Sequence, residues 1–250
     1  MAGQYIEAMR PTELLNALAA PLRRLPSQCA VCRDWAGQRL CDACALRHAA
    51  PRPRCRRCAI GVPEGVAVCG ACLTHAPPFD GAIAAVDYVH PWDELVRRFK
   101  FDAALDLADV LAQRLLDAVR RCDVAPPDWL LPVLLAAERL RERGYHQAWE
   151  LARRIARSLP CATDARLLLR MKDTPHQLAL PPGQRAANVR GAFALEPRRR
   201  HELHGRSVAV LDGVMTTGAT ASEITLTLLQ AGARSVQVWV LARTPRTEDA

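Results

Sequence analysis

The sequence predicts an α/β domain with a mainly parallel sheet, preceded by a small cysteine-rich module. From residue 81 onwards, short apolar runs typical of strands alternate with stretches of helical periodicity, and this alternation favours a parallel sheet. Eight of the ten cysteines crowd between residues 29 and 72, which sets that segment apart. We expect an N-terminal segment (1–26), the module (27–76) and the α/β domain (79–245), with Pro77-Pro78 between the last two.

The elements of the α/β domain follow from the apolar pattern and its breaks. Strands are expected at 81–89, 129–135, 165–169, 191–195, 208–211 and 236–241. Helices are expected at 95–100, 105–119 and 147–159, and one more begins near residue 217. The segment 174–190 contains proline and glutamine and is predicted to be mostly loop. Ligands of such sheets bind at the carboxyl ends of the strands, so the segment after residue 211 is the first candidate for a site.

Composition and charge narrow the classes of function. With 50% hydrophobic but only 5% aromatic residues, the 250-residue chain can build a core of mainly aliphatic side chains. Its formal net charge of +8 comes almost entirely from arginine, because Lys100 and Lys172 are the only lysines. Arginine suits bidentate phosphate contacts. A charge of this size permits nucleic-acid binding but does not establish it.

An apolar patch near the N-terminus could indicate a membrane span, a signal peptide or an amphipathic helix. No apolar run is long enough to span a bilayer, so we expect no membrane insertion. The patch at residues 14–22 has charged residues on both sides and no convincing cleavage site. These features favour an amphipathic helix in the segment 1–26 over a signal peptide. The chain is therefore expected to be cytoplasmic.

Four C-x2-C pairs predict metal binding. In a cytoplasmic protein such pairs indicate Zn²⁺ rather than disulfides, and two pairs supply the four thiolates of a closed structural site. The module is too short to bury a core of its own, so metal binding would supply its folding energy. We predict two structural Zn²⁺ ions, bound by Cys29, Cys32, Cys41, Cys44, Cys55, Cys58, Cys69 and Cys72.

Two pairing schemes are open for these cysteines. A sequential scheme joins the first pair with the second and the third with the fourth, whereas a cross-braced scheme joins the first with the third and the second with the fourth. The sequential scheme is favoured because each half then closes its own small loop. Arginines surround the pairs, which fits either a solvated basic face or a nucleic-acid surface; they are Arg33, Arg39, Arg47, Arg52, Arg54, Arg56 and Arg57.

The segment 207–220, SVAVLDGVMTTGAT, is the most informative stretch of the chain. Its apolar run ends in the acid Asp212, and a helical pattern begins about six residues later. Main-chain N–H groups at a helix N-terminus, threonine hydroxyls and a glycine that permits close approach together form a phosphate site. No Gly-Lys-Ser/Thr sequence follows, so the segment is not a P-loop. The loop residues are Thr216, Thr217, Gly218, Ala219 and Thr220.

A second polar run, RLRERGYHQ at residues 139–147, follows the apolar run that ends near residue 135. Arg139, Arg141 and Arg143 stand at alternate positions. They could clamp a polyanion at the same edge of the sheet as Asp212. The alternative is a helical surface run in which glutamates pair with neighbouring arginines.

Several ordered motifs resemble the ComF family of competence-associated, phosphoribosyltransferase-like proteins. They are the cysteine pairs, PPFD at 77–80, FKF at 99–101, RLRERGY at 139–145, DTPHQ at 173–177, NVRGAF at 188–193 and TTGAT at 216–220. The resemblance covers residues 29–243 and implies a double zinc ribbon (27–76) on a type I phosphoribosyltransferase-like fold (79–245). It also implies a link to the uptake or use of single-stranded DNA, with single-stranded DNA and a competence helicase as partners.

The resemblance assigns roles to the predicted site residues. The loop 216–220 resembles the signature that binds 5-phosphoribosyl-1-pyrophosphate (PRPP) and would anchor its 5-phosphate. Asp212 would hold a ribose hydroxyl, and Arg139, Arg141 and Arg143 would clamp the pyrophosphate. Pyrophosphate would leave from C1 of the ribose, with Mg²⁺ and the arginines neutralising its charge. His146 is a weak candidate for a general base.

Three departures from the family pattern weaken the expected catalysis. The second of two adjacent acids is replaced by Gly213, Glu138 stands where a lysine is usual, and His146 where an asparagine is usual. We therefore expect PRPP or a phosphoribosyl nucleotide to bind, with slow turnover or none. The alternatives to an active phosphoribosyltransferase are a catalytically silent nucleotide sensor that docks DNA or a helicase, and a zinc-stabilised adaptor.

Overall fold

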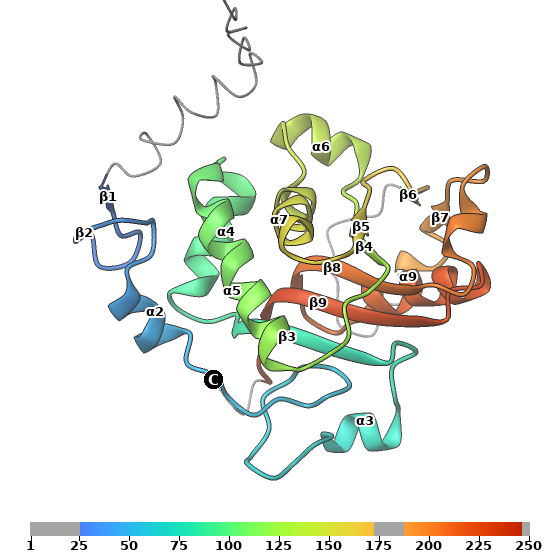
Figure 1. Cartoon of the computed structure of the whole chain (residues 1–250), viewed down its shortest axis with the longest axis horizontal. Helices are drawn as coiled ribbons and strands as arrows, with labels where there is room; N and C mark the ends of the chain where they lie inside the picture. The colour runs from blue at the N-terminus through green and yellow to red at the C-terminus, as the bar shows by residue number, and fades with distance from the viewer. Residues whose placement is uncertain (1–25, 173–187, 247–250) are drawn as a thin grey trace, which may run out of the picture. The chain divides into compact units, whose positions relative to one another are not determined.

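The structure is a computed structural model that describes residues 26–172 and 188–246. The chain divides into two compact units, Met1–Arg47 and His48–Ala250, which can be followed by colour in Figure 1. The predicted N-terminal helix, most of the predicted loop at 174–190 and the DTPHQ motif lie outside the described residues. The domain bounds near residues 26 and 76–79 stay a prediction.

The first unit holds the first two cysteine pairs. Two short antiparallel strands, β1 (Ser27–Gln28) and β2 (Trp35–Ala36), enclose the turn that carries Cys29 and Cys32. In this turn the N–H of Arg33 donates to the carbonyl of Cys29 at 3.0 Å. Helix α2 (Asp42–His48) begins directly after Cys41 and carries Cys44. The two pairs are thereby brought to face each other.

The second unit contains the α/β domain, and the predicted alternation of strands and helices is confirmed. Its strands are β3 (Gly81–Asp87), β4 (Trp129–Pro132), β5 (Ala162–Thr163), β6 (Leu168–Arg170), β7 (Phe193–Leu195), β8 (Ser207–Met215) and β9 (Ser235–Arg243). Its helices are α3 (Gly70–Thr74), α4 (Trp92–Phe101), α5 (Ala108–Arg121), α6 (Ala137–Arg143), α7 (Gln147–Ile155) and α9 (Ala219–Gln230). Short 3₁₀ turns are η1 (Leu105–Leu107), η2 (Ala156–Ser158) and η4 (Arg200–Leu203).

Five strands form a parallel sheet in the order β3-β9-β8-β4-β5. The central strand, β8, pairs with β9 from Ser207 to Met215 and with β4 on its other side. Its residues 208–211 are all buried, as expected for a strand that is covered on both faces. The predicted mainly parallel sheet is confirmed, and β6 and β7 form a separate antiparallel pair.

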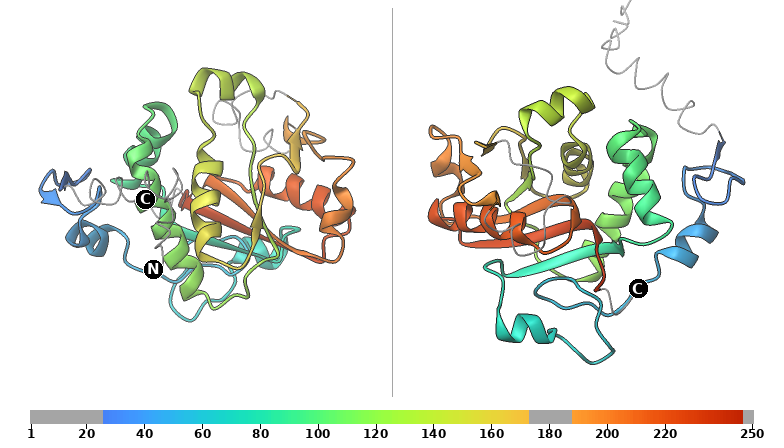
Figure 2. Two further views of the ribbon diagram at one scale, coloured as in Figure 1. Left: turned by 45° about the horizontal axis from the view of Figure 1, so that its top comes forward. Right: turned by 180° about the vertical axis from the view of Figure 1, so that it is seen from behind.

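Helices cover both faces of this sheet, as Figures 1 and 2 show. On one face lies α9, where Ile224 and Leu228 share a core with Val208 and Val210. On the opposite face, α5 and α7 contact each other, and each contacts strands of the sheet. This arrangement leaves the carboxyl ends of β4, β8 and β9 as the place where loops from different segments meet.

The two strands that lead to the predicted site, β8 and β4, differ in length from the prediction. The apolar run at 208–211 predicts a strand that ends before Asp212, but β8 continues to Met215, because pairing with β9 extends to Met215↔Arg243. In contrast, β4 ends at Pro132, and Val133 makes one more hydrogen bond, to the carbonyl of Leu211 at 2.8 Å. Asp212 therefore lies within a strand rather than directly after it.

Within the part of the chain that the structure describes, no helix is both long enough and apolar enough to cross a membrane.

Candidate functional site

The loop between β8 and α9, residues Thr216–Thr220, is called the phosphate loop below. Gly218 is the N-terminal cap of α9 and has a φ of 84°, a left-handed conformation that favours glycine. The N–H of Ala219 approaches the hydroxyl of Thr217 at 3.4 Å. The first turn of α9 thus presents main-chain N–H groups at the end of the central strand, which is the geometry of an anion site. The strand, loop and helix predicted here are confirmed.

Two residues of opposite charge, Asp212 and Lys100, line a cavity next to the phosphate loop. Asp212 accepts the N–H of Gly213 at 2.6 Å. Burial raises the pKa of Asp212, while Lys100, the Gly213 N–H and Arg170 act in the opposite direction. Burial likewise lowers the pKa of Lys100, and Asp212 opposes that shift. Lys100 and Asp212 line the same cavity, and each charge favours the ionised form of the other.

Gly213 occupies the position at which the resembling family has a second acid, and Lys100 fills the adjacent space. A Cβ atom built on Gly213 would lie 3.1 Å from Lys100 Cε and 3.6 Å from Nζ. Gly213 is not among the glycines with positive φ, so its conformation does not require glycine. The missing acid is thus replaced by the end of a lysine side chain.

A cavity of about 160 Å³ opens from Asp212 towards α6, and it is lined by residues of α4, α6, α7, α9, β6 and β8 and of the loop after β4. A smaller cavity lies against the phosphate loop, and Val133, Asp212, Val214 and Thr220 line both. The two cavities are therefore neighbours along one surface. The charged residues of the larger cavity are Lys100, Arg139, Arg143, Arg170 and Asp212.

The structure brings two of the three predicted arginines to this cavity. Arg139 and Arg143 lie one turn apart on α6, so they share a face. Arg141 lies between them in sequence, is exposed and does not line the cavity. The clamp stays a prediction, and α6 turns only Arg139 and Arg143 to the cavity, because side chains two positions apart on a helix point to different sides.

The arginines at the cavity are held by their neighbours. Arg143 lies over the ring of Phe101 at 4.9 Å and donates to Gln147 Oε1 at 2.6 Å. Arg170 lies over the ring of Phe193 at 5.5 Å and donates to the carbonyl of Leu134 at 3.3 Å. Side chains fixed in this way lose little conformational entropy when they bind an anion.

His146 is a helix cap in this structure. Its Nδ1 accepts the N–H of Trp149 at 2.9 Å at the start of α7, and its Nε2 lies 3.4 Å from the main-chain nitrogen of Leu135. Burial lowers its pKa to about 4, so the ring is neutral at physiological pH. The residue does not line the cavity, and the cap accounts for its position without a part in proton transfer.

Sequence reasoning did not single out Lys100 and Arg170 for this site. Lys100 is one of two lysines in an arginine-rich chain and lies in the FKF motif, a signal that would have found it. Arg170 lies at the end of β6, where nothing in the local sequence marks it. Only the packing of β6 and β7 beside the main sheet carries it to the cavity.

The cysteines form two tetrads that could each hold a metal ion. The first tetrad is Cys29, Cys32, Cys41 and Cys44, the second is Cys55, Cys58, Cys69 and Cys72, and in each the sulfur atoms lie within 4.8 Å of one another. The sequential pairing is confirmed and the cross-braced pairing is wrong. A tetrahedral ion with metal–sulfur distances of about 2.3 Å sets its sulfur atoms roughly 3.8 Å apart. The Sγ atoms of Cys32 and Cys41, and those of Cys58 and Cys69, lie 3.7 Å apart, which fits such an ion.

Taken together, the fold and the site define a class of protein. A parallel α/β sheet has a threonine- and glycine-containing loop and a helix N-terminus after its central strand, with arginines after the neighbouring strand, and two cysteine tetrads lie earlier in the chain. These are the features expected of a phosphoribosyltransferase-like protein with a double zinc ribbon.

Comparison with known proteins identifies the family. The chain is 31% identical over 230 residues to the DNA utilization protein YhgH of Escherichia coli K12, covering 88% of this chain and 98% of that protein. It is 33% identical over 208 residues to competence protein F of Haemophilus influenzae, covering 82% of this chain and 90% of that protein. The chain belongs to this family, the ComF family, as its motifs predict. No protein-family model matches it.

Solved structures of low similarity include phosphoribosyl-transferring enzymes. Glutamine PRPP amidotransferase from B. subtilis shares 16% identity, with a TM-score of 0.37 and coverage of 58% of this chain and 30% of that one. Hypoxanthine-guanine phosphoribosyl transferase from L. donovani shares 15% identity, with a TM-score of 0.32 and coverage of 57% and 72%. TM-scores this low do not support an assignment of fold or function. The family assignment rests on the sequence relatives.

Proposed function

We propose that this protein binds PRPP or a phosphoribosyl nucleotide in the two neighbouring cavities at the carboxyl ends of β4 and β8. The phosphate loop would hold the 5-phosphate through main-chain N–H groups and threonine hydroxyls. Asp212 would accept a hydrogen bond from a ribose hydroxyl. Arg139, Arg143 and Arg170 would face the pyrophosphate or second anionic group. Arg141 is left out because it does not line the cavity.

The observation that carries this proposal is that the two cavities are neighbours with shared lining residues. Asp212 and Thr220 line both of them, so one ligand bound there would lie between the helix N-terminus and the arginines. The helix end favours one anionic group, and the cationic side chains of the larger cavity favour another. A sugar with a phosphate at each end has this distribution of charge.

The residues of this site favour binding of the ligand with little catalytic turnover. Displacement of pyrophosphate from C1 builds positive charge on the ribose and negative charge on the leaving group, and Mg²⁺ bound to PRPP would neutralise part of the latter. The described residues fit a protein-bound Mg²⁺ poorly, because Asp212 is the only carboxylate among those that line the two cavities, and the cationic Lys100 lines the same cavity. A nucleotide-sensing protein is therefore the second candidate function, favoured by Gly213 and Lys100.

The two tetrads would hold Zn²⁺, each in an all-sulfur structural site. Their sulfur spacing suits a tetrahedral ion, and four thiolates leave no open position for a substrate. We expect each ion to stabilise the turns around its cysteines and to take no part in chemistry.

The names of the relatives suggest where the protein acts. They are described as DNA utilization and competence proteins, and we propose that this chain also works with single-stranded DNA, in the cytoplasm, beside a competence helicase. Its formal net charge of +8 would favour contact with a polyanion.

Calorimetric titration of the full chain tests the proposed ligand. PRPP and ribose 5-phosphate should both bind, and ribose without phosphate should not. The variant Arg139→Ala should weaken PRPP binding by about 10- to 100-fold, since a charged hydrogen bond contributes roughly 1.5–3 kcal/mol. Its affinity for ribose 5-phosphate should stay unchanged. Arg141→Ala, on the same helix but outside the cavity, is the matched control, and failure of wild-type protein to bind either phosphate refutes the proposal.

A further inference from the structure

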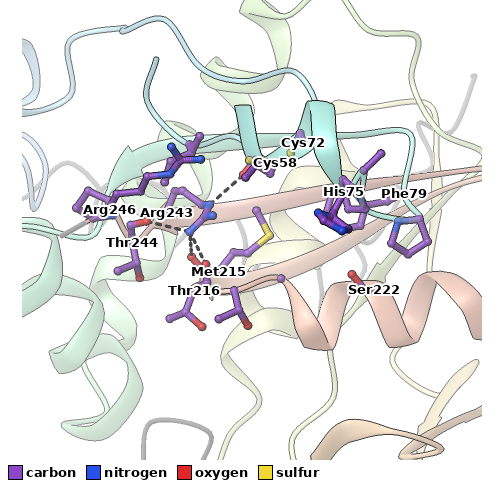
Figure 3. A pocket seen from close by; sticks show the side chains of 18 residues that line it. Cys58, Cys72, His75, Phe79, Met215, Thr216, Ser222, Arg243, Thr244 and Arg246 are labelled. Carbon is purple, nitrogen blue, oxygen red and sulfur yellow. Dashed lines mark hydrogen bonds between the residues drawn. The ribbon is translucent and has the colours of Figure 1, made fainter. Parts of the chain in front are cut away.

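Arg243 joins the second tetrad to the phosphate loop. It is the last residue of β9, and only 8% of its surface is exposed. Its Nε donates to the carbonyl of Cys58 at 2.9 Å. Its Nη1 donates to the carbonyls of Met215, at 3.1 Å, and of Thr216, as the dashed lines in Figure 3 show. One buried side chain therefore spans from a cysteine of the tetrad to the residues that begin the loop.

The turn at Cys58 has a conformation that a bound metal would hold. Ala59, directly after it, has a φ of 57°, which is unfavourable for a residue with a side chain. Ala59 is buried in a small core with Phe79, Met215 and Ala221. A metal on Cys55 and Cys58 would keep this turn closed, and with it the position of the Cys58 carbonyl.

A cavity of about 590 Å³ is lined by Cys58, Cys72 and His75 and by Thr216 and Gly218 of the phosphate loop. Figure 3 shows Cys58, Cys72 and His75 across the cavity from Thr216. Among the described residues, Arg243 and the small core at Ala59 connect the two sides of this cavity, and a change in the tetrad would reach the loop through them.

The guanidinium of Arg243 is bound by main-chain groups. Its four hydrogen bonds all go to main-chain carbonyls, the fourth being that of Thr244 at 2.9 Å. These bonds tie the position of the Cys58 carbonyl to those of Met215 and Thr216.

We propose that the second tetrad, when it holds its metal, fixes the phosphate loop through Arg243. Anion binding at the loop then depends on this metal and not on the metal of the first tetrad, which lies in the other unit of the chain. The inference rests on the proposed role of the loop in binding a phosphate. Arg243 is a positioning residue, because it acts through the carbonyls of Met215 and Thr216 and not on the ligand.

Hydrogen exchange of the intact chain tests the structural link. Cys72→Ser and Cys44→Ser are matched variants, because each is the last cysteine of its tetrad and both are buried, 8% and 7% exposed. Cys72→Ser should speed exchange at residues 214–218 by at least tenfold, and Cys44→Ser should leave it unchanged. Arg243→Met should act like Cys72→Ser, with the exposed Arg246→Met as its control. Metal content measured by mass spectrometry verifies that each cysteine variant has lost one ion.

Binding of ribose 5-phosphate tests the consequence. Cys72→Ser and Arg243→Met should each lose at least tenfold in affinity, while Cys44→Ser and Arg246→Met keep the wild-type value. Equal acceleration of exchange at 208–211, inside β8, would show a general loosening of the fold and overturn the proposal. The same effect in Cys44→Ser, or none in Cys72→Ser, would also overturn it. If wild-type protein does not bind ribose 5-phosphate, the proposed function fails, and exchange at 214–218 still decides the link.

Discussion

Restoring the missing acid with Gly213→Asp is the sharpest perturbation of the proposed site. Residue 213 lies inside β8 and its φ is not positive, so aspartate can adopt the same backbone conformation. Its Cβ would lie 3.1 Å from Lys100 Cε, a contact that the flexible end of a lysine relieves by moving a few tenths of an ångström. The substitution should therefore fold and place two carboxylates next to the ribose position.

The size of the effect follows from the charges. With Mg²⁺, a second carboxylate completes the acid pair and adds one charge-assisted contact, roughly 1.5–3 kcal/mol, so PRPP should bind about 10- to 100-fold more tightly. Without Mg²⁺, the new negative charge repels the pyrophosphate, and the affinity should fall below that of the wild type. The sign of the change thus depends on the metal.

Isothermal titration of PRPP with and without Mg²⁺ measures both affinities. Gly213→Asn is the matched control, because it displaces Lys100 to the same extent but adds no charge. Equal tightening with and without Mg²⁺, or the same gain in the asparagine variant, would refute the electrostatic reasoning. Rapid pyrophosphate release by the wild-type chain would refute the conclusion that its catalysis is weak.

Four further predictions address other parts of the molecule. The double variant Thr217→Ala, Thr220→Ala should weaken ribose 5-phosphate binding by about a hundredfold, because each lost contact costs roughly 1.5 kcal/mol. Calorimetry measures this affinity, and Thr227→Ala in α9 is the control. Protein purified without chelator should contain two Zn²⁺ per chain, and one or none in folded protein contradicts the two tetrads. Affinity for single-stranded DNA should fall as salt rises, because binding releases counterions; salt-independent binding contradicts this. Burial lowers the pKa of His146 to about 4. Its contribution to stability is therefore complete above the unfolded pKa near 6.5, and it is lost as pH falls towards 4. When the pH falls from about 7.5 to about 5.5, the free energy of unfolding measured with urea should decrease by about 1.4 kcal/mol. This decrease should be absent in His146→Gln and present in His201→Gln, which changes an exposed histidine.

The sequence by itself determined the features that depend on local pattern. The C-x2-C spacing predicts the turns that bring two cysteines together. The order of acid, threonines, glycine and helix predicts the phosphate loop. Both features depend on residues only a few positions apart. The alternation of strands and helices fixed the fold class for the same reason. The strand ends were less predictable, since β8 extends to Met215 through pairing with a strand more than 20 residues away.

Only the tertiary structure decided which side chains meet. The helical form of 137–143 turns Arg139 and Arg143 to one side and leaves Arg141 out. Lys100 reaches Gly213 from a helix more than 100 residues earlier in the chain, and Arg243 reaches Cys58 across 185 residues. Such contacts arise from the packing of whole elements around a shared core, where burial selects the arrangement, and local sequence pattern carries no information about the partner across that distance.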